Sequence, residues 1–388
     1  MFTIIIAAML SVISCGKKAT DTTSPPVVPP AKVFYNRSQF VMGADLSYVN
    51  QVQDYGGVYK DSGSVKDPFT IFKNHGANVV RVRLWHDPQW LKPLNAGKMY
   101  SDLYDVEKTI QRAKTAGMAV NLDVHYSDTW ADPANQTTPA AWTGLSLTVL
   151  KDSVYNYTLA VLNYLKTKNL VPEMIQVGNE NNNGMLWPAG QTSGTNFTAF
   201  CTLLNSGIKA VRDFSATSAI KPEIILHVAQ LQNASFWCSN VITSGGVTDF
   251  DIIGLSHYSK WGTINAMTDI KANISSLKTT YGKKVMIVET GYPFTLVNAD
   301  SYNNLIDASA AVSGYPITSD GQFNYMKDLT QAVIAGGGSG IMYWEPAWIT
   351  SSLRDLWGTG SSWDNMTLFD QSSNTLPAMD YMTYPYKF

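Results

Sequence analysis

The chain has 388 residues, of which 45% are hydrophobic, and its net charge at pH 7 is -2. This length suits one large domain or two smaller ones, and the near-neutral charge gives no electrostatic reason to expect a nucleic acid partner. The 20 tyrosines and 11 tryptophans suit either an aromatic core or a surface that stacks on flat ligands such as sugar rings.

The chain begins with a short, mostly apolar segment, residues 2–13. About a dozen residues are too few to cross a bilayer as a helix, so we predict a signal peptide over residues 1–14. The end of this segment resembles a bacterial lipoprotein signal, although no positive charge precedes it, and so predicts lipid attachment at Cys15. An ordinary signal peptide with an incidental cysteine is the alternative.

Residues 15–33 differ in composition from the rest of the chain. Thr, Ser and Pro are frequent here, which predicts an extended tether between the lipid and a domain over residues 34–388. We therefore expect an exported monomer, anchored only by lipid to a bacterial membrane and located at the cell surface or in the periplasm.

Two further cysteines, Cys201 and Cys238, fall on predicted helices. Their spacing matches no metal motif, so we expect buried thiols. A disulfide between them is the alternative in an exported protein.

From about residue 34, short apolar segments alternate with longer segments of helical periodicity. Eight strands are predicted, at residues 40–44, 79–84, 119–124, 174–177, 223–228, 252–256, 285–288 and 340–343. Helices are predicted at residues 104–116, 149–168, 197–214, 267–281 and 323–335. This alternation predicts a single (β/α)8 barrel, the TIM barrel fold. A doubly wound sheet is the alternative, but no glycine-rich phosphate loop follows the first strand.

Polar and aromatic residues gather at the carboxyl ends of the predicted strands. They are Asp45, Arg81, Arg83, His125, Asn179, Glu180, His257, Tyr258, Glu289, Trp344 and Glu345. Active sites of TIM barrels lie at this end. The structural alternatives are ion pairs for the arginines and core packing for the histidines. For Glu345 we favour a structural role, the capping of a helix.

Glu180 and Glu289 each stand where a short apolar strand ends, and a charge at such a position is costly unless it has a function. Cleavage of a glycosidic bond with retention uses one protonated carboxylic acid and one ionised carboxylate, about 5 to 5.5 Å apart. We expect Glu180 to keep its proton in a less polar place. Tyr258 and either Arg81 or Arg83 would keep Glu289 ionised.

Seven stretches around these positions carry a family resemblance. They are residues 43–47, 80–88, 125–133, 178–180, 183–188, 289–293 and 343–348. They resemble glycoside hydrolase family 53, the endo-β-1,4-galactanases of clan A, over about residues 40 to 370. The resemblance implies retaining hydrolysis of β-1,4-galactan in type I arabinogalactan, a side chain of pectin. Glu180 would be the acid/base and Glu289 the nucleophile.

The resemblance also implies residues that bind the substrate. Trp344 should lie beneath the sugar at the cleaved bond, with Asn179, His125 and Tyr258 around it. Further contacts are expected from Asp45, Arg81, Arg83, His257, Trp85, Trp130, Trp187, Trp261 and Trp348. Each of these last five tryptophans is either a subsite wall or part of the framework.

Two stretches depart from the family pattern. His257 and Ser259 stand where the family more often has Tyr and Pro, which leaves the local hydrogen bonding open. Some bacterial members hold calcium between the seventh and eighth loops. The counterpart here lacks one acid and the histidine, so a weak site at Asp300, Asn304 and Asp364 stays open. The expected chemistry itself requires no cofactor.

Two other functions are compatible with the sequence. A hydrolase of the same clan that cuts mannan or xylan would keep both glutamates and differ in its subsites. A lipid-tethered protein that binds glycan without cutting it would need neither glutamate, so the intact pair argues against that function.

Overall fold

The computed structural model describes residues 34–388, which form one compact unit. The predicted signal peptide, Cys15 and the tether lie outside the described residues. Between residues 34 and 388, no helix is long and apolar enough to cross a membrane.

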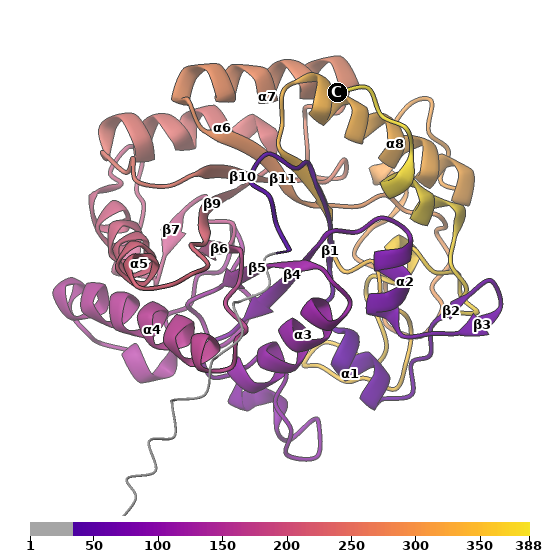
Figure 1. The fold of residues 1–388 in the computed structure, drawn as a ribbon, viewed down its shortest axis with the longest axis horizontal. Coiled ribbons are helices and arrows are strands. Elements are labelled where there is room, and N and C mark those ends of the chain that lie inside the picture. Colours follow the sequence, from indigo (N-terminus) through magenta and orange to yellow (C-terminus); the bar gives the residue numbers. More distant parts are fainter. Residues whose placement is uncertain (1–33) are drawn as a thin grey trace, which may run out of the picture. The chain divides into compact units, whose positions relative to one another are not determined.

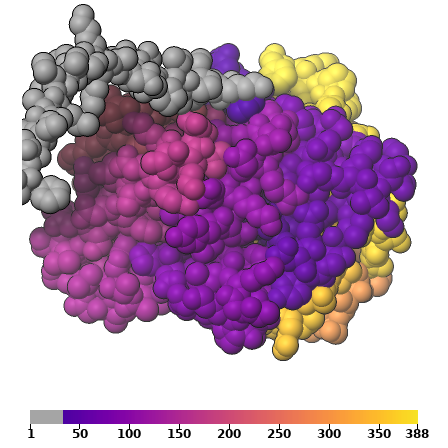
Figure 2. Space-filling model, turned by 60° about the horizontal axis from the view of Figure 1, so that its bottom comes forward, coloured from indigo at the N-terminus to yellow at the C-terminus, as the bar shows by residue number. Residues whose placement is uncertain are grey.

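Eight parallel strands close into a barrel, in the order β1-β12-β11-β10-β9-β6-β5-β4. Their bounds are β1 Val41–Asp45, β4 Val79–Leu84, β5 Ala119–Val124, β6 Met174–Val177, β9 Glu223–Ala229, β10 Ile252–His257, β11 Lys284–Thr290 and β12 Gly340–Tyr343. The sheet closes where β1 pairs with β12, so the predicted TIM barrel is confirmed and the doubly wound sheet is wrong. The same pairing places the C-terminal part of the chain (yellow) beside the N-terminal strands and helices (indigo) in Figure 2.

Helices form an outer ring around the strands (Figure 1). They are α1 Val49–Asp54, α2 Pro68–Asn74, α3 Leu103–Thr115, α4 Leu147–Thr167, α5 Thr198–Ala216, α6 Leu231–Cys238, α7 Met267–Tyr281 and α8 Ser319–Ala335. Four predicted strands and α7 have the predicted bounds. By contrast, α8 begins four residues before its predicted start, because the Thr318 side chain accepts a hydrogen bond from the Gly321 N–H and caps the helix there.

Two short hairpins complete the fold, β2 Lys60–Asp61 with β3 Ser64–Val65 and β7 Gly184–Met185 with β8 Gly190–Gln191. Cys201 in α5 and Cys238 at the end of α6 are buried and unpaired. The expectation of buried thiols is therefore confirmed, and the two cysteines form no disulfide in this structure.

The barrel interior is apolar at the end where the strands begin. A separate cluster of buried residues lies there, and it includes the first residues of five strands, Val41, Val79, Ala119, Met174 and Ile252. Phe34 and Tyr35 pack against this cluster. The polar and charged residues lie further along the strands, so one end of the barrel is a hydrophobic floor and the other carries the chemistry.

Candidate active site

Glu180 and Glu289 lie at the carboxyl-terminal mouth of the barrel. Glu180 follows β6, the fourth barrel strand in the chain, and Glu289 lies near the end of β11, the seventh. Ser256 of β10 connects them, because it is in register with Glu289 and its Oγ donates to Glu180 Oε1 at 2.5 Å. The carboxylates are close enough that the charge of Glu289 raises the pKa of Glu180.

Glu289 has two strong hydrogen-bond donors. Arg81 lies 2.7 Å from Oε1, and the Tyr258 hydroxyl donates to Oε2 at 3.1 Å. Burial raises the pKa of Glu289 to about 7, while the Arg81 charge and the Tyr258 hydrogen bond oppose that shift. A cation and a hydroxyl donor together favour the ionised carboxylate.

Glu180 has a weaker set of partners. Within residues 34–388, its carboxylate accepts a hydrogen bond from the Ser256 hydroxyl alone. Burial, and next the charge of Glu289, raise the pKa of Glu180 well above its usual value. Of the two carboxyls, Glu289 therefore ionises first and Glu180 keeps the proton, since the adjacent negative charge disfavours a second one.

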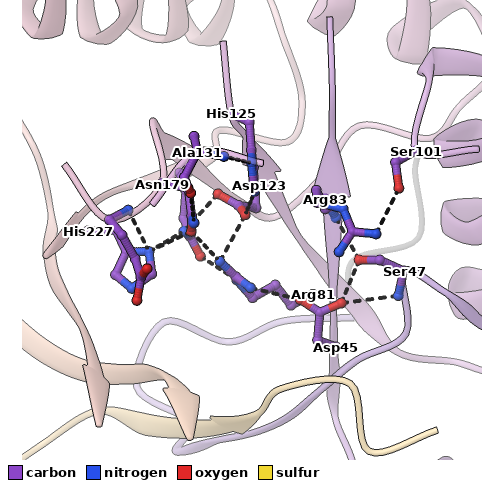
Figure 3. A network of polar contacts seen from close by, with 12 residues as sticks. Asp45, Ser47, Arg81, Arg83, Ser101, Asp123, His125, Ala131, Asn179 and His227 are labelled. Atoms are coloured by element: carbon purple, nitrogen blue, oxygen red, sulfur yellow. Dashed lines mark hydrogen bonds and ion pairs between the residues drawn. The ribbon is translucent and has the colours of Figure 1, made fainter. Parts of the chain in front are cut away.

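Arg81 lies at the centre of the buried polar network (Figure 3). Its guanidinium contacts three carboxylates, Asp45 at 2.7 Å, Asp123 at 2.9 Å and Glu289 at 2.7 Å. It also donates to Gln176 and Asn179. Burial alone would lower the pKa of Arg81, but the carboxylates raise it above the usual value, so the side chain stays charged. Arg81 is therefore both a member of a structural ion-pair network and a contact of Glu289 in the site.

His125 is a neutral, oriented histidine. Its Nε2 lies 2.9 Å from Asp123 Oδ2, and the Ala131 N–H donates to its Nδ1 at 3.2 Å. Nε2 therefore carries the proton. Burial lowers the pKa of His125, which keeps the imidazole uncharged. Asn179 donates to the carbonyl of the same Ala131, so Figure 3 shows both predicted residues joined to one network.

His227 and Ser256 are site residues that the sequence did not reveal. His227 of β9 lies 2.8 Å from the Ser256 Oγ and 2.8 Å from Asn179 Oδ1, which links it to Glu180 through one hydroxyl. Asp123 and Gln176 were missed as well. Asp123, Gln176 and Ser256 are the last-but-one residues of their strands, and His227 lies two residues before the end of β9. The period-two alternation from His125 back to Asp123 was the signal that could have identified one of them.

His257 does not face the site, and its predicted role in substrate binding is wrong. It is fully buried, and its Nε2 lies 3.0 Å from the Tyr325 hydroxyl of α8. Successive side chains of a strand point to opposite faces, so Ser256 faces the barrel interior and His257 faces the helices. The alternative, a core histidine, is correct.

Arg83 is also buried, and its predicted contact with substrate stays a prediction. Its guanidinium carbon lies 4.1 Å from the centre of the Trp130 ring and 4.5 Å from that of Trp85, and Nη1 contacts Glu345 at 3.2 Å. Glu345 accepts a hydrogen bond from the N–H of Tyr48, the residue before α1. Glu345 is therefore mainly the partner of Arg83. The helix that it caps is α1, which lies about 300 residues earlier in the chain.

The predicted tryptophans divide by exposure. Trp344, Trp130 and Trp187 are half-buried, and Trp261 is 47% exposed, so these four can contact a ligand. Trp85 and Trp348 are 1% and 2% exposed, so they are framework and not subsite walls. Trp344 stands edge-on to the buried Trp363 at 4.6 Å between ring centres, which fixes its orientation. The sequence missed Trp357, which is 57% exposed and packs on Trp90.

Several residues one to three positions after barrel strands have a positive φ. Glu180 and Glu345 both have φ of 44°, and Tyr126 and Gln230 have φ of 50° and 66°. Such conformations cost non-glycine residues about 1–3 kcal/mol each and concentrate at functional sites. At Glu180 this turn follows Gly178, whose φ is 87°, and lets the strand end abruptly at the mouth.

Asp300, Asn304 and Asp364 do not fit a calcium ion in their present arrangement. Asp300 accepts hydrogen bonds from the N–H groups of Tyr302 and Ser361, and Asp364 accepts from Asn304 Nδ2 at 2.7 Å. Calcium needs six to eight oxygen ligands, whereas these carboxylates face N–H donors. Among the described residues, no group of three or more His, Cys, Asp or Glu side chains could hold a metal ion.

The chain matches known proteins over most of its length. Residues 41–382 match the family model of glycosyl hydrolase family 53. An arabinogalactan endo-β-1,4-galactanase of Cellvibrio japonicus is 43% identical over 91% of this chain and 93% of that protein. An endo-β-1,4-galactanase of Bacillus subtilis is 34% identical over 91% of this chain and 87% of its own length.

Solved structures give the same result. A family 53 catalytic domain from Ignisphaera aggregans superposes with a TM-score of 0.80 at 33% identity, covering 94% of this chain and 100% of that one. Fungal β-1,4-galactanases superpose with a TM-score of 0.74 at 30% identity, over 89% and 99% of the two chains. A xylanase from Caldicellulosiruptor owensensis, only 13% identical, shares the fold alone, with a TM-score of 0.56. The chain belongs to glycosyl hydrolase family 53.

Proposed function

We propose that this protein is an endo-acting β-1,4-galactanase that cleaves the galactan of type I arabinogalactan with retention of configuration. The observation that carries the proposal is the pair Glu180 and Glu289, two carboxyls at one barrel mouth with opposite preferred proton states. A general acid and a nucleophile are what a double displacement requires. The names of the relatives with high identity support galactan as the polymer.

In the proposed reaction, Glu180 gives its proton to the leaving glycosidic oxygen while a Glu289 oxygen bonds to the anomeric carbon. The aglycone leaves with the electron pair of the broken bond. Glu180, now ionised, then takes a proton from water, whose oxygen attacks the same carbon and releases Glu289. Arg81 and Tyr258 hold the attacking carboxylate in place through its two oxygens.

The aromatic residues at the mouth suit a sugar polymer. Trp344, Trp130, Trp187 and Trp261 are all accessible, and aromatic rings pack well on the apolar faces of pyranose sugars. His125, Asn179 and Asp45 belong to the network beneath them, where they fix the catalytic groups. We propose the four tryptophans as subsite walls, with Trp344 nearest the cleaved bond.

Export and anchoring are also part of the proposal. The apolar segment before Cys15, and the Pro-rich residues after it, support a lipoprotein signal and a tether. A galactanase held in this way would act on pectic side chains outside the cytoplasm.

The substrate is tested by incubating the purified protein with linear galactan, mannan and xylan and measuring reducing ends and product lengths. We expect activity on galactan, with oligosaccharides of intermediate length appearing first, because an endo-acting enzyme cuts internal bonds. Activity on mannan or xylan with none on galactan would overturn the assignment. Binding to galactan without cleavage would favour the glycan-binding alternative.

The two glutamates have separable roles. Glu180→Ala and Glu289→Ala should each lower kcat on galactan by about a thousand-fold or more, since each removes a reacting group. On an aryl galactoside with a good leaving group, Glu180→Ala should still form the glycosyl-enzyme rapidly, because departure of that group needs no proton. Glu289→Ala should not. Equal behaviour of the two variants on the aryl substrate would contradict the roles.

Ser256 is a positioning residue for Glu180. Its hydroxyl stabilises the ionised form of Glu180 and so lowers the pKa of that carboxyl, opposing the larger effect of burial. Ser256→Ala should therefore move the alkaline limb of kcat/KM to higher pH and lower kcat by about ten-fold or more. Ser256→Thr keeps the hydroxyl and serves as the control. An unchanged pH profile in Ser256→Ala would show that the contact has no such effect.

Tyr258 acts on the other carboxyl. Its hydroxyl lowers the pKa of Glu289, although burial and other charges raise it overall. Tyr258→Phe should raise that pKa and shift the acid limb of kcat/KM upward by about one pH unit, since hydrogen bonds to charged groups contribute about 1.5 kcal/mol or more. Tyr325→Phe removes a buried hydroxyl that lies 3.0 Å from the core-facing His257 Nε2, and it should leave both limbs in place. A shift of equal size in the two variants would contradict the assignment.

A further inference from the structure

The end of the barrel opposite the catalytic mouth carries a cluster of basic side chains, here called the basal face. It consists of Arg37, Lys73, Lys166, Lys221, Lys278 and Lys283, all exposed or half-exposed. The barrel strands are parallel, so the ends of the helices and the starts of the strands meet at this one end. The six cations come from these connections.

Hydrogen bonds place individual cations on this face. Lys73, in the last turn of α2, donates to the carbonyl of Gly117 after α3. Lys166, in the last turn of α4, donates to the carbonyl of Thr217 after α5. Lys278 of α7 reaches in the same way across to the carbonyl of Gly337, after α8.

The remaining members lie just before strands. Lys283 precedes β11 and donates to the carbonyls of Thr248 and Phe250. Lys221 precedes β9, and Arg37 donates to its carbonyl at 2.9 Å. Carbonyl contacts at helix ends are favourable for cations but leave their full charge in place.

None of the six cations has a carboxylate partner within residues 34–388. Neighbouring cations on the same end do, since Lys284 pairs with Glu223 and Arg212 pairs with Asp249 and Asp251. The whole chain has a net charge of -2, so a surface with six unpaired cations means an excess of acid elsewhere. The six unpaired cations are therefore available to an anionic partner.

The N-terminal segment joins the domain on this same face. Phe34 and Tyr35 pack against the apolar floor of the barrel, and the Tyr35 hydroxyl donates to Glu223 at 2.7 Å. Cys15 precedes Phe34 by 19 residues. Nineteen residues reach at most about 60 Å, so the lipid proposed at Cys15 would leave this face free to reach a bilayer.

We propose that the basal face docks on an anionic lipid surface and thereby holds the catalytic mouth away from the membrane. Six unpaired cations on one face are complementary to a layer of anionic headgroups. An acidic polysaccharide would meet the same charges. The described residues begin on this face with Phe34 and Tyr35, so the lipid proposed at Cys15 favours the membrane. This inference does not depend on which polymer the enzyme cuts.

The test uses residues 34–388, which form one compact unit with its own core, so that neither a lipid nor the apolar leader contributes to binding. Its co-sedimentation is measured with vesicles of phosphatidylcholine alone and of phosphatidylcholine mixed with phosphatidylglycerol. We expect binding only to the anionic vesicles, and weaker binding as sodium chloride is added.

Two charge variants with equal numbers of substitutions complete the test. Replacing Lys73, Lys166, Lys221, Lys278 and Lys283 by Gln should weaken partitioning by about ten-fold or more, since Gln keeps a donor but loses the charge. Replacing Lys98, Lys108, Lys151, Lys209 and Lys271 by Gln removes the same charge from other surfaces and should change it by less than about two-fold. Unchanged activity on soluble galactan oligosaccharides confirms folding of both.

Three outcomes would overturn the proposal. The first is equal binding to neutral and anionic vesicles, and the second is an equal effect of the two sets of substitutions. The third is displacement of the protein from anionic vesicles by polygalacturonate at low concentration, which would identify an acidic polysaccharide as the partner of this face. If the variant of the basal face fails to fold, the binding of the unsubstituted protein to anionic vesicles must still weaken as sodium chloride is added, and salt-independent binding would overturn the proposal.

Discussion

The buried charge of Arg81 is the constraint on which the rest of the site depends. Its guanidinium lies inside the barrel, 1% exposed, and contacts Asp45, Asp123 and Glu289 from three different strands. A lone charge in such a place would be very costly, and removing one partner of a buried pair typically costs about 3–5 kcal/mol. The barrel therefore has to close with these strands in register, which also places Glu289 at the mouth.

This arrangement separates the two carboxyls that we propose as catalytic, because it gives them different electrostatic surroundings. Glu289 has Arg81 and Tyr258 as donors. Among the residues that the structure describes, Glu180 has only the Ser256 hydroxyl as a side-chain donor, and the negative charge of Glu289 raises its pKa. One proton is therefore held by the pair, and it resides on Glu180. The same scaffold explains why His125 and His227 stay neutral, since burial lowers the pKa of each imidazole.

The two ends of the barrel have opposite chemical character for a related reason. The apolar cluster at the strand starts seals one end, and Phe34 and Tyr35 cover it. Charged residues further along the strands can then be buried only because they satisfy one another near the other end. Loops beyond that end are joined by carboxylates such as Asp300 and Asp364, which accept hydrogen bonds from backbone and side-chain donors. These bonds tie the loops after β11 and β12 together.

The sequence by itself determined the barrel, its strand order along the chain and the two glutamates, because short apolar strands and their polar ends are local patterns. It could not decide which polar side chains face inward. His257 and Ser256 are neighbours in one strand, yet only Ser256 reaches the site, since a strand alternates its faces and the phase is set by packing. Burial of Trp85, Trp348 and Arg83, and the link from His227 to Glu180, likewise depend on strands far apart in the chain. Only the closed barrel brings those strands side by side.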